Sequence, residues 1–137
     1  MKKLFVDTNI VIDLLSRREP HFLEAAALFS MADKKQIKIT VSSLTIANTN
    51  YALMRQMDGR KAKSILRKLR LITGVLPLNE KIIDLALNDE TMPDFEDALQ
   101  YFIALENAQD IIITRNLKDF RSSRLPVMTA NQFINVL

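Results

Sequence analysis

Short apolar segments that alternate with helical patterns constrain the fold of this chain more than any other feature. Strand-like runs lie at residues 4–6, 36–41, 75–78, 110–114 and 126–128. Helical patterns fill the intervals, at residues 9–16, 21–32, 42–57, 60–72, 79–88, 93–108 and 129–137. Continuous apolar strands separated by helices are typical of a parallel sheet that is covered on both faces. The sequence therefore predicts an α/β fold in three layers, with a central parallel sheet of about four to five short strands flanked by helices.

Capping and breaking residues set the expected ends of these elements. Ser42 or Ser43 is suited to cap one helix, and Asn79 and Thr129 are suited to cap two others. Gly74 is expected to end the helix at residues 60–72.

The length and composition exclude several classes of protein. A chain of 137 residues is expected to form a single domain, residues 1–137. It has no cysteine, which excludes disulfides and thiolate metal sites and suits a reducing cytoplasm. We see no signal peptide, and no apolar run has the length of a membrane span. With two glycines, the chain also lacks a glycine-rich phosphate loop. We therefore expect a cytoplasmic protein that does not associate with membranes.

Polar residues follow three of the expected strands, at the point where each strand ends. Asp7 follows the first strand, Ser42 the second, and Thr114 with Asn116 the fourth. Ligands of parallel sheets bind in a crevice beyond the carboxyl ends of the strands, so these residues mark the expected site. Thr8 and Asn9 either cap the following helix or donate hydrogen bonds to carboxylates, and the two roles are compatible.

A second group of acids begins the helix at residues 93–108. Asp94 and Asp97 are three residues apart and share a helix face, whereas Glu96 is expected to point elsewhere. Acids are common in the first turn of a helix, where they offset the helix dipole, and this alternative applies most strongly to Asp94. Asp97 borders the apolar stripe of the helix, which favours its partial burial.

Convergence of Asp7 and Asp97 at one sheet edge, with Asp94 and Asp119 beside them, predicts a metal site. Carboxylates held together repel one another unless a cation lies among them. Oxygen ligands without histidine or cysteine suit Mg²⁺ or Mn²⁺, and such a site suits phosphoryl chemistry, most simply the cleavage of nucleic acid. Asp13 is expected to cap, to face solvent or to bind metal, and the only histidine, His21, is expected to be a cap or surface residue.

Three stretches of the chain together resemble the PIN domain family, and in particular its VapC-like branch of toxin components. They are FVDTNIVIDLL, ITVSSLTIANTNYAL and DFEDALQYFIALENAQDIIITRNLKDF. The resemblance implies a Mg²⁺- or Mn²⁺-dependent endoribonuclease with a parallel sheet flanked by helices. It also implies inhibition by a cognate antitoxin protein, and a homodimer.

The resemblance assigns roles to individual residues. Asp7 matches the first acid of the family motif, and Asp97 matches the acid that opens the long helix. The remaining matches are Asp94 before that helix, Asp119 as the last acid, and the polar residues Asn9, Thr114 and Asn116. We expect Asp7, Asp97 and Asp94 to bind the metal, with Asp119 completing the catalytic set and Thr8 supporting it.

One position departs from the family pattern. The family carries a glutamate on the helix after the second strand, where this chain has Asn48. Asp94 could compensate, or Asn48 and Asn50 could serve as neutral ligands. The alternative is a catalytically weakened PIN fold that acts as an RNA- or protein-binding module.

Basic residues supply candidate contacts for RNA. Seven Lys or Arg side chains lie between Arg55 and Arg70, against the single acid Asp58. They form either a polyanion-binding surface or an ordinary solvated helix face. The residues expected to contact RNA phosphates are Arg115, Arg60, Lys63 and Arg67.

Overall fold

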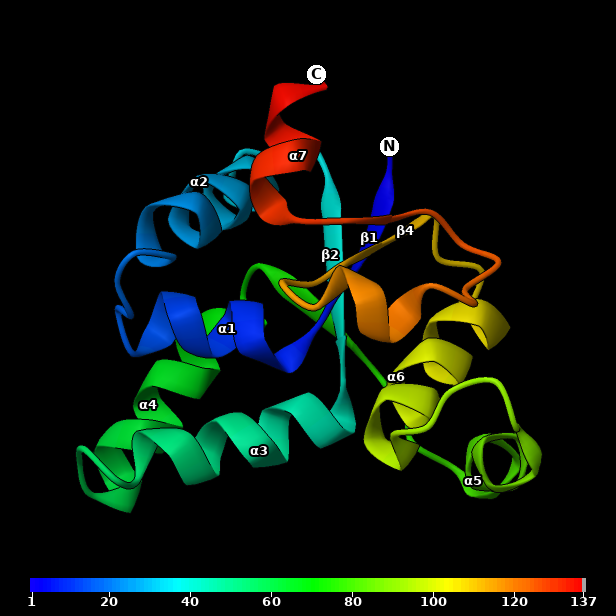
Figure 1. Cartoon of the computed structure of the whole chain (residues 1–137). Coiled ribbons are helices and arrows are strands. Elements are labelled where there is room, and N and C mark those ends of the chain that lie inside the picture. The colour runs from blue at the N-terminus through cyan, green and yellow to red at the C-terminus, as the bar shows by residue number, and fades with distance from the viewer. Residues whose placement is uncertain (137) are drawn as a thin grey trace.

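The computed structural model describes residues 1–136 and contains a five-stranded, fully parallel sheet. The strand order is β3-β2-β1-β4-β5, so that β1 lies in the centre (Figure 1). The strands are β1 (Lys3–Val6), β2 (Lys38–Ser42), β3 (Thr73–Leu76), β4 (Ile111–Ile113) and β5 (Val127–Met128). The predicted α/β class and parallel sheet are confirmed.

Helices connect successive strands, as parallel pairing requires. They are α1 (Thr8–Leu15), α2 (Phe22–Asp33), α3 (Ser43–Leu53), α4 (Gly59–Arg70), α5 (Glu80–Asn88), α6 (Phe95–Glu106) and α7 (Ala130–Asn135), with a 3-10 turn, η1 (Leu117–Phe120), after β4. Ser42, Asn79 and Thr129 cap α3, α5 and α7 as predicted, each accepting a backbone N–H through its side chain.

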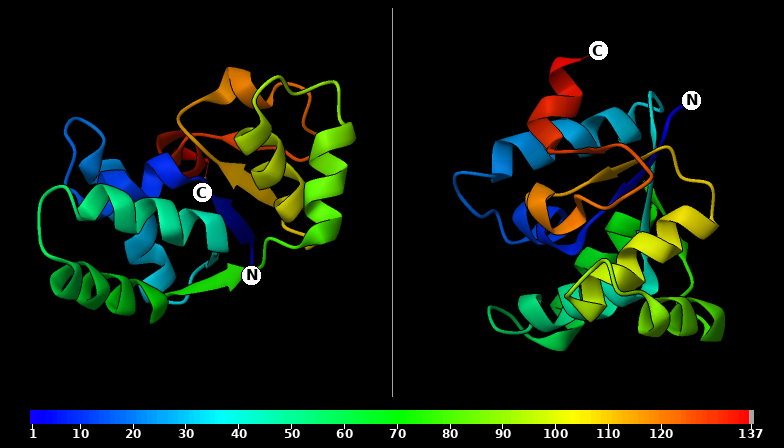
Figure 2. Two further views of the ribbon diagram at one scale, coloured as in Figure 1. Left: turned by 90° about the horizontal axis from the view of Figure 1, so that it is seen from below. Right: turned by 45° about the vertical axis from the view of Figure 1, so that its right-hand side comes forward.

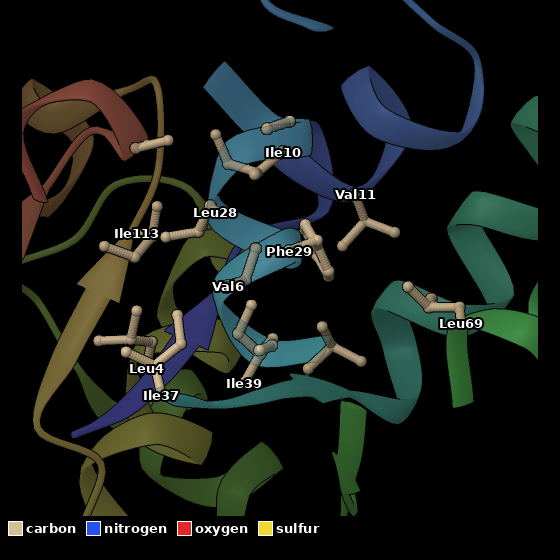
Figure 3. Packing of buried hydrophobic residues seen from close by; sticks show 14 of the residues in the cluster. Leu4, Val6, Ile10, Val11, Leu28, Phe29, Ile37, Ile39, Leu69 and Ile113 are labelled. Atoms are coloured by element: carbon tan, nitrogen blue, oxygen red, sulfur yellow. The ribbon is translucent and has the colours of Figure 1, made fainter. Parts of the chain in front are cut away.

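The two faces of the sheet carry separate apolar cores because successive strand residues point to opposite sides. Leu4 and Val6 belong to the core beneath α1, α2 and α4, in which Phe29 of α2 packs near them (Figure 3). Phe5 points to the other core, beneath α5 and α6. Figure 2 shows α5 and α6 on the opposite side of the sheet from α2 and α7. Burial on both sides explains why the strands are apolar throughout.

Gly74 differs from its predicted role. It lies inside β3, where it pairs with Thr40 of β2, and the helix ends earlier, at Arg70. The Thr73 hydroxyl donates to the Leu69 carbonyl at 3.0 Å and closes the last turn. A β-carbon at position 74 would lie 3.3 Å from the Thr40 methyl group, so glycine permits this close strand pairing. Helix α3 is also shorter than predicted and ends at Leu53. Within the described part of the chain, none of the helices combines the length and apolarity needed to cross a membrane.

Candidate functional site

Asp7 lies at the carboxyl end of the central strand, where β1 passes into α1. Its backbone N–H donates to the Ile113 carbonyl of β4 at 2.9 Å, which fixes the residue against the neighbouring strand. Its φ and ψ of −72° and 156° are those of an N-cap residue. The starts of α1, α3 and α6 lie near this end of the sheet (Figure 1).

Four donors surround the Asp7 carboxylate. Oδ1 accepts from the Thr8 backbone N–H at 2.8 Å and from Gln100 Nε2 at 3.3 Å. Oδ2 accepts from the Thr114 hydroxyl at 2.8 Å and from Asn9 Nδ2 at 3.4 Å. All four donors are neutral. Asp7 is only 7% exposed, and its burial raises its pKa, although the bonds from Thr114, Thr8 and Gln100 lower the pKa in part and Asp119 raises it further.

Gln100 is a further residue of this site, which the sequence motifs do not indicate. It is 2% exposed, and its Nε2 donates to Thr45 Oγ1 at 2.8 Å and lies 3.2 Å from Thr8 Oγ1. Its Oε1 is buried without a hydrogen-bond partner. The available signal was a carboxamide on the apolar face of a helix, one turn after Asp97, because such a group needs polar partners when it is buried.

The acids at the start of α6 are held differently. Asp94 is the N-cap and accepts the Asp97 backbone N–H at 2.9 Å, so the capping role weighed for it is present. Burial is the main cause that raises the pKa of Asp97 to about 7, and the charges of Asp94, Asp7, Asp119 and Glu96 contribute to the same shift. Neighbouring acids thus oppose ionisation of Asp97.

A depression of about 320 Å³ connects α6 with η1. Its lining includes three acids, Asp94, Asp97 and Asp119, and two cations that the sequence analysis did not single out, Lys118 and Arg121. The depression therefore joins the predicted acids to basic side chains from the turn after β4. Asn116 is exposed at the beginning of this turn, and its backbone N–H donates to Thr114 Oγ1 at 3.1 Å.

The donor chemistry of this region fits a hard divalent cation. Its acids are oxygen donors, no cationic side chain is bonded to Asp7 in the structure described, and burial together with the other acids raises the pKa of Asp97. Within residues 1–136, no three acid or histidine side chains form a ready-made chelate. Mg²⁺ does not require one, since it keeps several waters and is commonly bound through one or two carboxylates.

Asn48, in the middle of α3, contacts Glu96 in the first turn of α6. Asn48 Nδ2 donates to Glu96 Oε1 at 2.8 Å. The exposed Glu96 side chain is thus directed at α3, whereas Asp94 and Asp97 line the depression beside η1. Glu96 does point elsewhere than these two acids, as expected.

Asp13 is also placed differently from the expectation of a capping or solvent-facing residue. It is fully buried and pairs with Arg115 (Nε–Oδ2, 2.8 Å) and Arg18 (Nη2–Oδ1, 3.1 Å). The Arg115 guanidinium, predicted to contact RNA, is thus directed at Asp13. The Arg115 backbone N–H lies 3.4 Å from Asn9 Oδ1, which links this ion pair to the Asp7 region.

The basic helix lies away from the acids. Helix α4 carries Arg60, Lys63 and Arg67 and packs mainly on α3 and β3, whereas α6 packs mainly on α5 and η1. Figure 1 shows α4 and α6 on opposite sides of the molecule. The structure therefore does not bring the three predicted RNA contacts of α4 to the acids.

His21 occupies the N-cap position of α2 without a side-chain capping bond.

Comparisons with known proteins find similar sequences and similar folds. A model of the PIN domain matches residues 3–118. The chain is 31% identical over 137 residues to Ribonuclease VapC1 of Aquifex aeolicus (strain VF5), covering 96% of this chain and 93% of that protein. A toxin-antitoxin complex from Klebsiella pneumoniae contains a chain of similar fold, with a TM-score of 0.70 and 22% identity over 93% of this chain and 97% of that one. Mycobacterium tuberculosis VapC20, described as a Sarcin-Ricin loop cleaving toxin, gives a TM-score of 0.61 and 18% identity over 80% and 86% of the two chains.

Proposed function

The chain belongs to the PIN domain family, and we propose that it is a divalent-metal-dependent endoribonuclease, the toxin of a toxin–antitoxin pair. The observation that carries the proposal is the Asp7 carboxylate, buried at the end of the central strand with neutral donors only. The similarity to a ribonuclease over almost the whole chain supports RNA as the substrate class.

Asp7 and Asp97 would hold the cation, Mg²⁺ or Mn²⁺, with Asp94 and Asp119 beside them. A bound cation of this kind activates a water molecule and neutralises charge on a phosphodiester. Asp7 is preorganised for the role because its oxygens are already fixed by hydrogen bonds. The raised pKa of Asp97 means that a proton and a metal compete for its carboxylate near neutral pH.

The polar residues around Asp7 would orient its carboxylate. Thr114 and Asn9 bind Oδ2, while Thr8 binds Oδ1 through its backbone. Asn116 would help by holding the Thr114 hydroxyl through its backbone N–H. The exposed cations Lys118 and Arg121, which line the acidic depression, are better placed than α4 to contact RNA phosphates.

Two protein partners belong to the proposal. A related fold occurs in a toxin-antitoxin complex, and we propose that a cognate antitoxin binds this chain as well. We also propose a homodimer. Large apolar side chains that are exposed, among them Tyr51, Met54, Leu71 and Leu87, are available for such contacts.

Cleavage of a mixed-sequence RNA by the purified chain tests the proposal. The reaction is run with Mn²⁺, with Mg²⁺ and with EDTA, using the parent and Asp7→Asn. We expect cleavage that requires the metal and falls at least about 10³-fold in the variant, because a catalytic metal contributes several kcal/mol to transition-state stabilisation.

Two results would contradict it. Cleavage that persists in EDTA would show that the reaction needs no divalent metal. Equal cleavage by Asp7→Asn would show that Asp7 is not part of the catalytic site. RNA binding without cleavage by the folded parent under all metal conditions would instead favour a binding module. Light scattering of the purified chain measures the proposed dimer directly.

A further inference from the structure

Helices α3 and α6 are joined by two side-chain hydrogen bonds that lie one helical turn apart. The inner bond connects Gln100 Nε2 of α6 to Thr45 Oγ1 of α3 at 2.8 Å. The outer bond connects Asn48 Nδ2 of α3 to Glu96 Oε1 of α6 at 2.8 Å. Asn48 follows Thr45 by three residues and Glu96 precedes Gln100 by four, so both pairs share a helix face.

The inner bond is part of the Asp7 region, because the same Gln100 amide lies 3.3 Å from Asp7 Oδ1. A helical turn advances about 5 Å along the axis. Glu96 therefore lies about one helical turn farther from the protein interior than Gln100, on the side of α6 that faces α3. Asp97 follows Glu96 in the chain and precedes Gln100 by three residues. Glu96 and Asp97 therefore lie one turn before Gln100 on α6, and Gln100 contacts Asp7.

The charge of Glu96 is not neutralised by the chain. Among residues 1–136, its recorded side-chain contact is the neutral amide of Asn48, and no Lys or Arg forms an ion pair with it. An independent feature lies beneath it: Gln100 Oε1, on a side chain 2% exposed, is a buried acceptor without a donor beside Asp7. Such an oxygen is expected to be satisfied by a bound water or ion.

From these contacts we infer that Glu96 is an additional anionic donor of the divalent-metal site and that Asn48 is its positioning residue. The inference rests on the proposed function. Position 48 of α3 carries an amide and not a carboxylate. In this inference the carboxylate comes from Glu96 of α6, and the Asn48 amide holds it in place. The amide restricts the rotamers of an exposed, flexible side chain, and an ordered ligand costs less entropy to bind metal.

Titration calorimetry with Mn²⁺ in the absence of RNA tests the inference on the full chain. The variants are Glu96→Gln, the exchanged pair Asn48→Glu with Glu96→Gln, and Glu24→Gln as the matched control. Glu24 is also an exposed acid in the first turn of a helix, α2, so its replacement removes the same charge from the first turn of another helix. Circular dichroism and metal-free melting temperatures establish that each variant is folded.

We expect Glu96→Gln to weaken Mn²⁺ binding by at least about tenfold, which is the usual range for a residue near a bound metal. The exchanged pair should regain most of the loss, because it restores one carboxylate and one amide across the same helix contact. Glu24→Gln should bind as the parent does.

Mn²⁺ binding by Glu96→Gln equal to that of the parent would overturn the inference. Failure of the folded exchanged pair to regain affinity would also overturn it. Both results are distinct from failure of the proposed function, in which the parent itself shows no Mn²⁺ binding that depends on Asp7. A parent that requires Asp7 and not Glu96 therefore keeps the function and rejects only the added donor.

Discussion

Asp7 and Asp13 stand near opposite ends of α1, and the chain surrounds their buried carboxylates in different ways. Asp13 is paired with two arginines, Arg18 and Arg115. Asp7 receives hydrogen bonds from neutral groups only, and burial and the charge of another acid, Asp119, raise its pKa. One carboxylate has its counter-charge supplied by the protein, and the other does not.

This difference separates a structural acid from a candidate catalytic acid more clearly than burial does. A buried ion pair satisfies the charge, and removal of one partner leaves the other uncompensated. A buried carboxylate with neutral donors is held in place but still favours a cation. The two acids are six residues apart in the sequence, and both are buried, so their bonding partners show which one has its charge compensated by the protein.

The largest expected contrast comes from replacing each acid with asparagine. Asp13→Asn should lower the free energy of unfolding by about 2–3 kcal/mol, since it breaks a buried pair whose arginines keep partial access to water. Asp7→Asn should change it by less than about 1 kcal/mol, because relief of the buried charge offsets the altered hydrogen bonds, in which the Thr114 hydroxyl can become an acceptor. Urea unfolding of the metal-free variants measures both values.

The activity of the same two variants should follow the opposite order. Asp7→Asn should lose metal-dependent cleavage while remaining folded, whereas Asp13→Asn should retain cleavage at temperatures where it is folded. If Asp7→Asn were the more strongly destabilised variant, the distinction between the two carboxylates would be wrong.

A smaller effect is expected from pH. The pKa of Asp97 is raised from 3.8 to about 7 in the folded chain, so the folded state holds this proton more tightly than the unfolded state does. The stabilisation is fully present below pH 3.8 and is lost as the pH rises through about 7. The raised pKa of Asp7 acts in the same direction. Metal-free melting temperatures of the parent and Asp97→Asn, measured across this range, should therefore converge at low pH and diverge as Asp97 ionises.

Mn²⁺ supplies the control for the pH experiment. Metal binds the ionised carboxylate, so Mn²⁺ should restore stability to the parent above pH 7 and affect Asp97→Asn less. If the melting temperatures of parent and variant change in parallel from pH 4 to 8, Asp97 does not have the raised pKa on which this prediction rests.

Much of the fold follows from local patterns in the sequence. The strands are apolar because both faces are buried, and the caps at Ser42, Asn79 and Thr129 are visible as single residues before helical patterns. Gly74 lies inside β3 although glycine commonly terminates helices, so the prediction of a helix end there is wrong. Its actual role depends on close pairing with Thr40, 34 residues earlier in the chain, which local reasoning does not reveal.

The candidate site was predictable where it depends on strand ends and not where it depends on distant partners. Asp7 and Thr114 follow neighbouring parallel strands, so their proximity follows from the topology. The pairing of Asp13 with Arg115 spans 102 residues, and the Asn48–Glu96 contact spans 48. These contacts require the packing angles of α1, α3 and α6. Gln100 illustrates the same point, because its burial is suggested by the helix pattern but its partners are not.

The smallest expected effect concerns two buried threonines that differ in their hydrogen bonds. Thr114 donates to Asp7 Oδ2 at 2.8 Å and accepts from the Asn116 backbone, whereas Thr49 Oγ1 is buried without a partner. Valine has nearly the shape of threonine, so each replacement removes mainly the hydroxyl. Thr114→Val should cost about 1–2 kcal/mol, because it leaves polar partners unsatisfied, and Thr49→Val should be neutral or stabilising. Urea unfolding at pH 7 compares the two. Loss of the Thr114 bond should also raise the pKa of Asp7 further, since this bond favours the ionised form. Equal unfolding free energies for the two variants would mean that Thr114 does not hold the Asp7 carboxylate, and the preorganisation inferred for Asp7 would lose its main support.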